Sequence, residues 1–357
     1  MKKSYLLMAA AATIFAACSE TDLVNPVYEA QNEIGFENHV GKTTRAEITD
    51  EAALAAEGGF VVWGWKTPTA NIAWASATNI FNGVNVFAQT VSGDATVWTY
   101  TNKKYWDKTS TYNFYAVAPY SPTSGAYSIS GAADGLITIT GAQSALASVS
   151  DDFLIDRDGA TGINGATVNT EGKHNKVGFD FNHVMAKVTL KLLSGDINEG
   201  DVITVTKLTM SGWNSNNGTF VQKSDYTAST TNHSEWTITD KTVGSVTFEK
   251  TGGYTLNETT AVAVEDSYIM VPQTIAASTL KFTVDFTITY KDDDDDPENN
   301  VTEEFIGHEG TLATAQIWGT DTHTTYTIKV GPQPIEFDVT SVKGFTNTVT
   351  PGDLPIE

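Results

Sequence analysis

The sequence predicts an all-β protein built from two tandem β-sandwich domains of Greek-key type. Three observations predict this fold. The chain has 357 residues, a length typical of two domains. Short segments of alternating apolar and polar residues recur at short spacing, with almost no helical period between them. Glycine is abundant, at 29 residues, and it accompanies many Thr, Ser, Asn and Val residues, as in sheets joined by turns.

The first domain is predicted over residues 46–176. A short helix is expected over 50–56, with Asp50 as its N-cap. In the first strand Gly64 marks a bulge or a close backbone approach, and Asn82-Gly83 is a candidate turn. Residues 97–107 are expected to form two short strands around an Asn-Lys-Lys turn. The predicted strand segments are 60–66, 80–91, 97–107, 112–120, 136–140 and 152–156.

The second domain is predicted over residues 177–357. The boundary is placed there because residues 159–176 are rich in Gly and Asn, as linkers often are. The strands expected in this domain are 177–193, 202–212, 245–250, 263–272, 280–290, 303–310, 326–331 and 335–344.

The N-terminus predicts export. Lys2 and Lys3 precede a short apolar stretch over residues 5–17, too short for a permanent membrane span. The following Phe15-Ala16-Ala17-Cys18 is similar to the lipobox of bacterial lipoproteins. Residues 1–17 are therefore a predicted signal peptide, and Cys18 is the predicted lipidation site. Three acyl chains on Cys18 would anchor the protein firmly in the outer membrane. The competing interpretation is an ordinary signal peptide with a chance cysteine.

Charge and cysteine content exclude several functions. The formal net charge is −22, and loss of Lys2 and Lys3 with the signal peptide makes it −24. Such a surface repels the phosphate backbone, so a nucleic-acid partner is excluded. Cys18 is the only cysteine, so the mature chain forms no internal disulfide and depends on its core for stability.

No sequence motif predicts an enzyme or a cofactor. The chain has no GxSxG, HExxH, P-loop or GxGxxG motif. Asp292, Asp294, Asp296 and Glu303 match four ligand positions of an EF-hand loop, but Pro297 stands where that loop requires glycine. These four residues are weak metal candidates, and a solvated hairpin loop is the favoured explanation for them. His183 is expected in a core or between domains.

Several longer segments resemble, in order, the fimbrillin family of type V pilus subunits. A segment TTRAE (43–47) is similar to the processing region of that family. The other segments are FVVWGWK (60–66), VWTYTNKKYWD (97–107), YNFYAVAP (112–119), DDFLIDRD (151–158), FDFNHVMAKVTLKL (179–192), IWGTDTHTTYTIKV (317–330) and PIEFDV (334–339).

The resemblance implies transthyretin-like sandwiches and an assembly route. Cleavage between Arg45 and Ala46 would release residues 18–45, the lipidated tether with a removable first strand at 34–36. The gap would be filled by a strand from another pilus subunit, with residues 335–357 as the candidate donor. Pro351 and Pro355 make the end of that segment a poor strand, so an accessory, tip or anchor role stays open. A host or bacterial surface receptor is a further implied partner.

Two other functions compete with a fimbrial subunit or adhesin. The first is an outer-membrane glycan-binding lipoprotein, which would stack sugars on tryptophans. The second, ranked far behind, is a surface hydrolase. Core packing is the competing explanation for the tryptophans. Those considered are Trp63, Trp65, Trp74, Trp98, Trp106 and Trp213.

Overall fold

A computed structural model of the chain confirms the all-β prediction. Among the residues it describes, no helix is long and apolar enough to cross a bilayer. The described residues are 33–40, 50–68, 76–90, 96–120, 128–142, 152–168, 176–215, 218–238, 242–264, 268–292 and 299–344.

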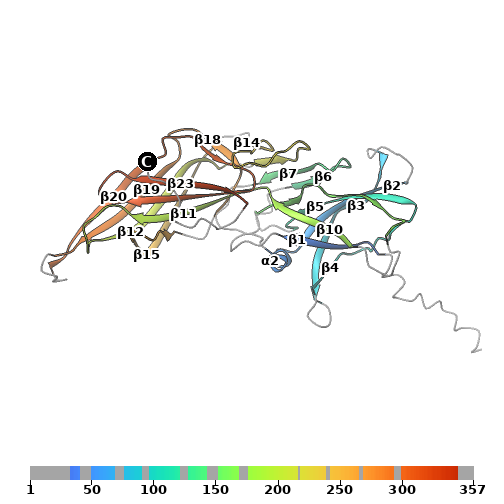
Figure 1. Cartoon of the computed structure of the whole chain (residues 1–357), viewed down its shortest axis with the longest axis horizontal. Coiled ribbons are helices and arrows are strands. Elements are labelled where there is room, and N and C mark those ends of the chain that lie inside the picture. The colour runs from blue at the N-terminus through green and yellow to red at the C-terminus, as the bar shows by residue number, and fades with distance from the viewer. Residues whose placement is uncertain are drawn as a thin grey trace, which may run out of the picture.

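The N-terminal half is organised around one large sheet, drawn in blue to green in Figure 1. The helix α2 (Glu51–Ala56) begins as predicted, because the Asp50 side chain accepts a hydrogen bond from Ala53 N at 2.8 Å. In order across the sheet, the strands are β1 (Gly35–Val40), β10 (Lys176–His183), β8 (Leu154–Asp156), β5 (Ser110–Ala118), β2 (Phe60–Pro68), β3 (Thr78–Thr90) and β4 (Thr96–Thr99), with β9 (Ala160–Asn164) paired to β5.

The C-terminal half is a sandwich of two sheets around a second core. Its first sheet consists of β16 (Val262–Ala263), β11 (Ala186–Ser194), β22 (Thr322–Val330) and β23 (Glu336–Lys343), with β17 (Tyr268–Met270) also paired to β11. Its second sheet consists of β15 (Val243–Thr255), β12 (Val202–Asn214), β19 (Lys281–Tyr290) and β20 (Val301–Thr311). A small pair is formed by β18 (Gln273–Ile275) and β21 (Gln316–Trp318).

The two halves are interlocked by an antiparallel sheet of four strands, two from each half. From the N-terminal half come β6 (Ser128–Gly131) and β7 (Ile137–Ala142), and from beyond β12 come β13 (Gly218–Val221) and β14 (Trp236–Ile238). This sheet covers the outer face of β2 and β5. The apolar cluster between them contains side chains from both halves, including Val117, Phe220, Trp236 and Val271. The halves therefore share a core as well as a chain connection.

Three strand predictions need correction. Asn82-Gly83 is not a turn: β3 continues through it, and Gly83, at φ +66°, is an extra residue opposite a register shift in β2. The second strand expected in 97–107 is absent from the described chain, where Tyr105 makes only an isolated bridge to Glu33. Residues 177–193 are two strands, β10 and β11, because Val184-Met185 carries the chain from one sheet to another.

The predicted division at residue 177 falls at the start of β10. Strand pairing places β10 in the N-terminal sheet, beside β1 and β8, so the sheets change at Val184-Met185. The bulge or close approach predicted at Gly64 is confirmed: the register shifts after it, and an added Cβ would lie 2.7 Å from the Phe114 ring.

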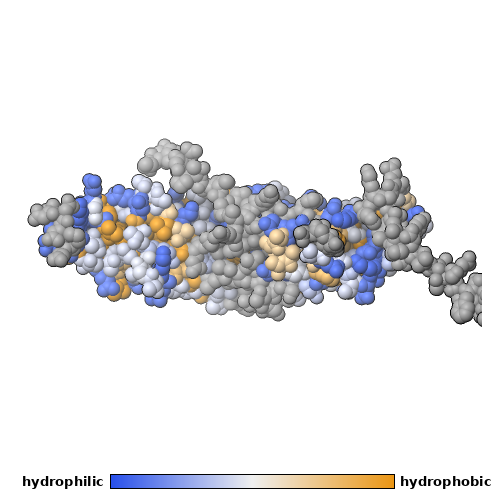
Figure 2. All heavy atoms as spheres, turned by 90° about the horizontal axis from the view of Figure 1, so that it is seen from below, coloured by the Kyte–Doolittle hydropathy of each residue, from blue (hydrophilic) through white to orange (hydrophobic). Residues whose placement is uncertain are grey.

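The surface of the elongated molecule is mixed rather than uniformly polar. Figure 2 shows hydrophilic surface interspersed with hydrophobic patches on the face drawn there. Large apolar side chains that are exposed in the C-terminal half include Val243, Val301 and Ile306.

The shared cluster predicts coupled unfolding of the two halves. Trp236 is buried in it, and its indole N–H donates to Val184 O at 2.7 Å. We expect Trp236→Ala to lower the free energy of unfolding by about 3–5 kcal/mol and to keep one urea transition, followed by fluorescence and circular dichroism together. Val301→Ala, an exposed control, is expected to change stability by less than about 0.5 kcal/mol. Two separate transitions, of which Trp236→Ala moves one, would contradict the shared core.

Candidate functional site: the groove occupied by strand β1

Strand β1 lies at the edge of the large sheet. It pairs in parallel with β10 over six residues, from Gly35 opposite Lys176 to Val40 opposite Phe181. No strand of the described chain pairs along its other side beyond the single bridge from Glu33 to Tyr105. The strand is therefore bound by one ladder and by its side chains, as an edge strand is.

The side chain of Phe36 fills an aromatic pocket and is 1% exposed. Its ring is stacked on Phe179 at a centroid distance of 5.9 Å. It meets Phe81, Tyr100 and Phe114 edge to face at 5.4, 5.5 and 6.0 Å. Full burial of a phenylalanine contributes about 1.5–3 kcal/mol, and such ring contacts add to it. Phe36 is thus the main anchor of β1.

A second contact holds the start of β1. Ile34 is fully buried, its N–H donates to Lys104 O at 2.9 Å, and the Tyr100 hydroxyl donates to Ile34 O at the same distance. Burial raises the pKa of Tyr100 well above its usual range, so the hydroxyl stays a donor. Lys103 Nζ lies 2.5 Å from Glu33 Oε1. The residues predicted as a second strand therefore form the side wall of the groove instead.

Without β1 this site would be an open apolar groove. Its floor would expose Phe81, Phe114 and Phe179, and β10 would present an unpaired row of N–H and C=O groups. Both features favour binding of an extended segment, because backbone groups complete the ladder while alternate side chains enter pockets. The geometry is suited to strand recognition rather than to catalysis.

The predicted lipidation and cleavage sites lie outside the described residues. This applies to Cys18, Arg45 and Ala46. The described part of β1 ends at Val40, and description resumes at Asp50, just before α2. The predicted cleavage site therefore falls, in sequence, between the edge strand and the rest of the sheet.

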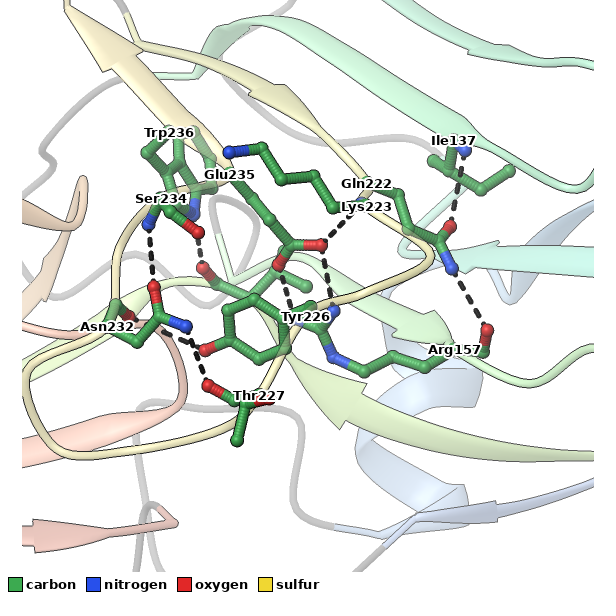
Figure 3. Close-up of polar contacts among 11 residues, drawn as sticks. Ile137, Arg157, Gln222, Lys223, Tyr226, Thr227, Asn232, Ser234, Glu235 and Trp236 are labelled. Atoms are coloured by element: carbon green, nitrogen blue, oxygen red, sulfur yellow. Dashed lines mark hydrogen bonds and ion pairs between the residues drawn. The ribbon is translucent and has the colours of Figure 1, made fainter.

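The chain has two arginines, Arg45 and Arg157. Figure 3 shows Arg157, which follows β8, held against the segment between β13 and β14. Its guanidinium makes a bidentate ion pair with Glu235 at 3.0 and 2.8 Å and lies 4.1 Å from the centre of the Tyr226 ring. The Glu235 side chain is fully buried and also accepts from Lys223 N at 2.8 Å. Sequence reasoning missed this contact, since nothing local links residues 157 and 235.

The weak metal candidates are not assembled into a site within the described chain. Asp292 and Glu303 lie at the two ends of the hairpin between β19 and β20, while Asp294 and Asp296 fall outside the described residues. Glu303 accepts from the Tyr290 hydroxyl at 3.1 Å. No group of three or more His, Cys, Asp or Glu that could hold a metal occurs among the residues described. The flanking strands confirm the hairpin interpretation.

The predicted core placement of His183 and of most tryptophans is confirmed. His183 is buried with its Nδ1 2.8 Å from Asp152 Oδ1, where the two halves meet. Trp106 is half-buried, and Trp74 lies outside the described residues. The tryptophans buried in the three cores, and so unavailable for sugar stacking, include Trp63, Trp65, Trp98 and Trp213.

The candidate donor segment begins as strand β23. This strand is the last in its sheet and pairs only with β22 in the described chain, from Lys329 opposite Glu336 to Thr322 opposite Lys343. Its burial alternates between exposed and half-buried residues. Residues 345–357, with Pro351 and Pro355, lie outside the described residues.

The fold and the groove define a β-rich protein whose first strand is paired along one side and covers an aromatic groove. The particular family is clear from comparison: the chain belongs to the fimbrillin-like family, whose model matches residues 44–351. Over 221 residues it is 27% identical to the fimbrium subunit Fim1C of Phocaeicola vulgatus ATCC 8482, covering 59% of this chain and 56% of that one. The match thus spans about half of that relative's length.

The fold is shared with a solved protein. A fimbrial protein from Bacteroides vulgatus ATCC 8482 superposes with a TM-score of 0.62 at 20% identity, covering 88% of this chain and all of that one. At this identity the likeness concerns the fold alone.

The aromatic pocket predicts a large effect of Phe36. Phe36→Ala is expected to lower the free energy of unfolding by about 3–5 kcal/mol, because it leaves a cavity among four rings. Glu37→Ala, an exposed neighbour on the same strand, is the matched control and should change it by less than about 0.5 kcal/mol. Urea denaturation measures both. Equal stability of the two variants would show that β1 does not complete the core.

The Arg157–Glu235 pair predicts selective proteolysis. An arginine-specific endoprotease should spare Arg157 in the folded chain, because its partly buried side chain is held by two hydrogen bonds to the buried Glu235. Glu235→Gln breaks that pair and is expected to open a second cut after Arg157, seen by mass spectrometry of timed digests. Asp225→Asn, at an exposed position nearby, should leave Arg157 protected. Rapid cleavage after Arg157 in the unmodified protein would contradict this role.

Proposed function

We propose that this chain is a subunit of a surface fimbria, exported as a lipoprotein and assembled with other subunits by strand exchange. The observation that carries the proposal is the position of strand β1. It covers an aromatic groove at the edge of the sheet, and in the described chain its ladder is formed with β10 alone. Membership of the fimbrillin-like family supports the same role. The role is structural and adhesive rather than enzymatic, and it requires no cofactor.

We infer the order of steps from the resemblance of the chain to the fimbrillin family. Lipidation of Cys18 anchors the precursor in the outer membrane. Cleavage between Arg45 and Ala46 then separates β1 from α2 and the rest of the sheet. Arg157, the second arginine, is engaged with Glu235, so we expect an arginine-specific protease to act at Arg45.

Release of β1 makes assembly favourable. Loss of Ile34 and Phe36 from the core costs about 1.5–3 kcal/mol for each side chain, in addition to the broken ladder. A strand from a second subunit restores both contributions. Each subunit that receives a strand at one end and donates one from the other forms a head-to-tail contact, which does not close and therefore extends into a filament.

The test is controlled cleavage of the full chain. An arginine-specific endoprotease should cut once, after Arg45, and the nicked protein should form oligomers over time in size-exclusion chromatography, with loss of the β1 fragment. The matched control is Arg45→Lys, which keeps the charge and removes the site, and which should stay uncut and monomeric. A nicked protein that retains β1 and remains monomeric would refute assembly by strand exchange.

A further inference from the structure

The outer end of the N-terminal half carries a cluster of lysines, which we call the lysine end. Three of them are exposed in the loop that forms the side wall of the groove, and a fourth forms an ion pair with Asp107 of that loop at 3.2 Å. The fifth begins β10, at the end of that strand away from the contact between the halves. Such a concentration of positive charge is unexpected in a chain with a formal net charge of −22. The lysine end consists of Lys66, Lys103, Lys104, Lys108 and Lys176.

Two carboxylates on and beside β1 partly neutralise the lysine end in the intact chain. Lys103 Nζ lies 2.5 Å from Glu33 Oε1, and Glu37 lines a small cavity together with Lys176. Both glutamates belong to the segment that the proposed cleavage releases. Of the charged groups named, the five lysines and Asp107 then remain. Release of β1 therefore raises the positive charge of this end in the same step that opens the groove.

The C-terminal half carries an acidic cavity of about 550 Å³ at its outer end. The cavity is lined by the turn between β22 and β23 and by the loops that follow β11 and β15. Three exposed carboxylates line it, from Asp196, Glu258 and Glu336, against one lysine, Lys329. The apolar part of the lining includes Ile197, Pro332 and Pro334.

The lysine end and the acidic cavity lie at opposite ends of the elongated molecule. Strand β10 starts at Lys176 and runs to the contact between the halves, where Val184-Met185 carries the chain into β11. Strand β11 continues to Ser194, which lines the acidic cavity. In Figure 1 the first end is the one with β1 and β4, and the second is the one with β12 and β20. The two surfaces can therefore meet only between two copies placed in line.

We propose that the lysine end of one processed copy docks on the acidic cavity of the next copy, as a surface contact separate from the exchanged strand. This inference rests on the proposed function and adds a second contact between successive subunits. Because the whole chain is strongly acidic, most orientations of two copies repel each other. The pairing of these two surfaces brings opposite charges together, which favours the head-to-tail orientation over the others.

Tyr105 supplies an apolar centre for the contact. Its side chain is 48% exposed and follows Lys104 in the loop of the lysine end. The proline and isoleucine side chains of the acidic cavity offer it an apolar surface. An aromatic side chain at the centre with charged groups around it is the usual composition of a specific protein interface.

The assembly rates of charge-reversed variants test this contact. Lys104→Glu with Lys108→Glu reverses two exposed charges of the lysine end. The matched control, Lys250→Glu with Lys281→Glu, changes the net charge equally at two lysines that belong to neither surface. A third variant adds Asp196→Lys and Glu258→Lys to the reversed lysine end. Each full chain is nicked after Arg45, and oligomer formation is followed by light scattering at low salt and at 1 M salt.

At low salt we expect the reversed lysine end to form oligomers at least about tenfold more slowly than the control, because it loses electrostatic steering. The difference should disappear at 1 M salt, where the screening length falls to about 3 Å. Reversal of the cavity in the same chain restores opposite charges at the contact, and it should return the rate to within about threefold of the unmodified protein.

Equal rates for the reversed lysine end and the control would overturn the contact and leave strand exchange intact. A rate that the changes at Asp196 and Glu258 fail to restore would overturn the pairing with the acidic cavity. Absence of oligomers from the unmodified nicked protein would refute the proposed function itself, and this contact with it.

Discussion

The burial of Phe36 among four aromatic rings is the contact on which the N-terminal half depends. It comes from a strand that is tied to the sheet by one ladder, so a single side chain contributes much of the binding of β1. The rings that receive it come from β3, β5 and β10 and from Tyr100 after β4. The groove that β1 fills is therefore the site at which the proposed strand exchange would take place.

The remaining contacts explain how the fold would tolerate exchange of this strand. The opposite face of the large sheet is covered by β6, β7, β13 and β14, and its cluster contains no residue of β1. The ion pair between Arg157 and Glu235 holds the segment between β13 and β14 against the N-terminal half. Loss of β1 would therefore expose the apolar cluster that contains Phe36, while the cluster shared by the two halves would stay buried.

Local chemistry was enough to predict much of the fold. The alternating segments gave β2, β5, β12 and β19, and the Asp50 cap gave α2, because these features depend on neighbours in sequence. The turn expected at Asn82-Gly83 was wrong, since a long strand absorbs the glycine as a bulge against β2. Short strands such as β13 and β14 have no periodic signal: β13 forms against the edge that β7 offers, and β14 pairs in turn with β13.

The sequence was enough to locate the first strand of the site, but not to identify the strands and side chains that surround it. The apolar Ile34-Gly35-Phe36 segment marks a strand, yet its parallel partner β10 is about 140 residues away, a pairing that alternation cannot reveal. The wall formed by Tyr100 and Lys104 uses hydrogen bonds to the β1 backbone, which leave no pattern in the sequence. The role of Glu235 in holding Arg157 is hidden for the same reason.

The most direct measurement is the N-terminus of the native protein, determined by mass spectrometry on sheared surface filaments and, separately, on outer membranes. Replacement of β1 by a strand of another subunit predicts that filament subunits begin at Ala46. An intact, acylated Cys18 in filament subunits, with β1 still attached, would contradict the account.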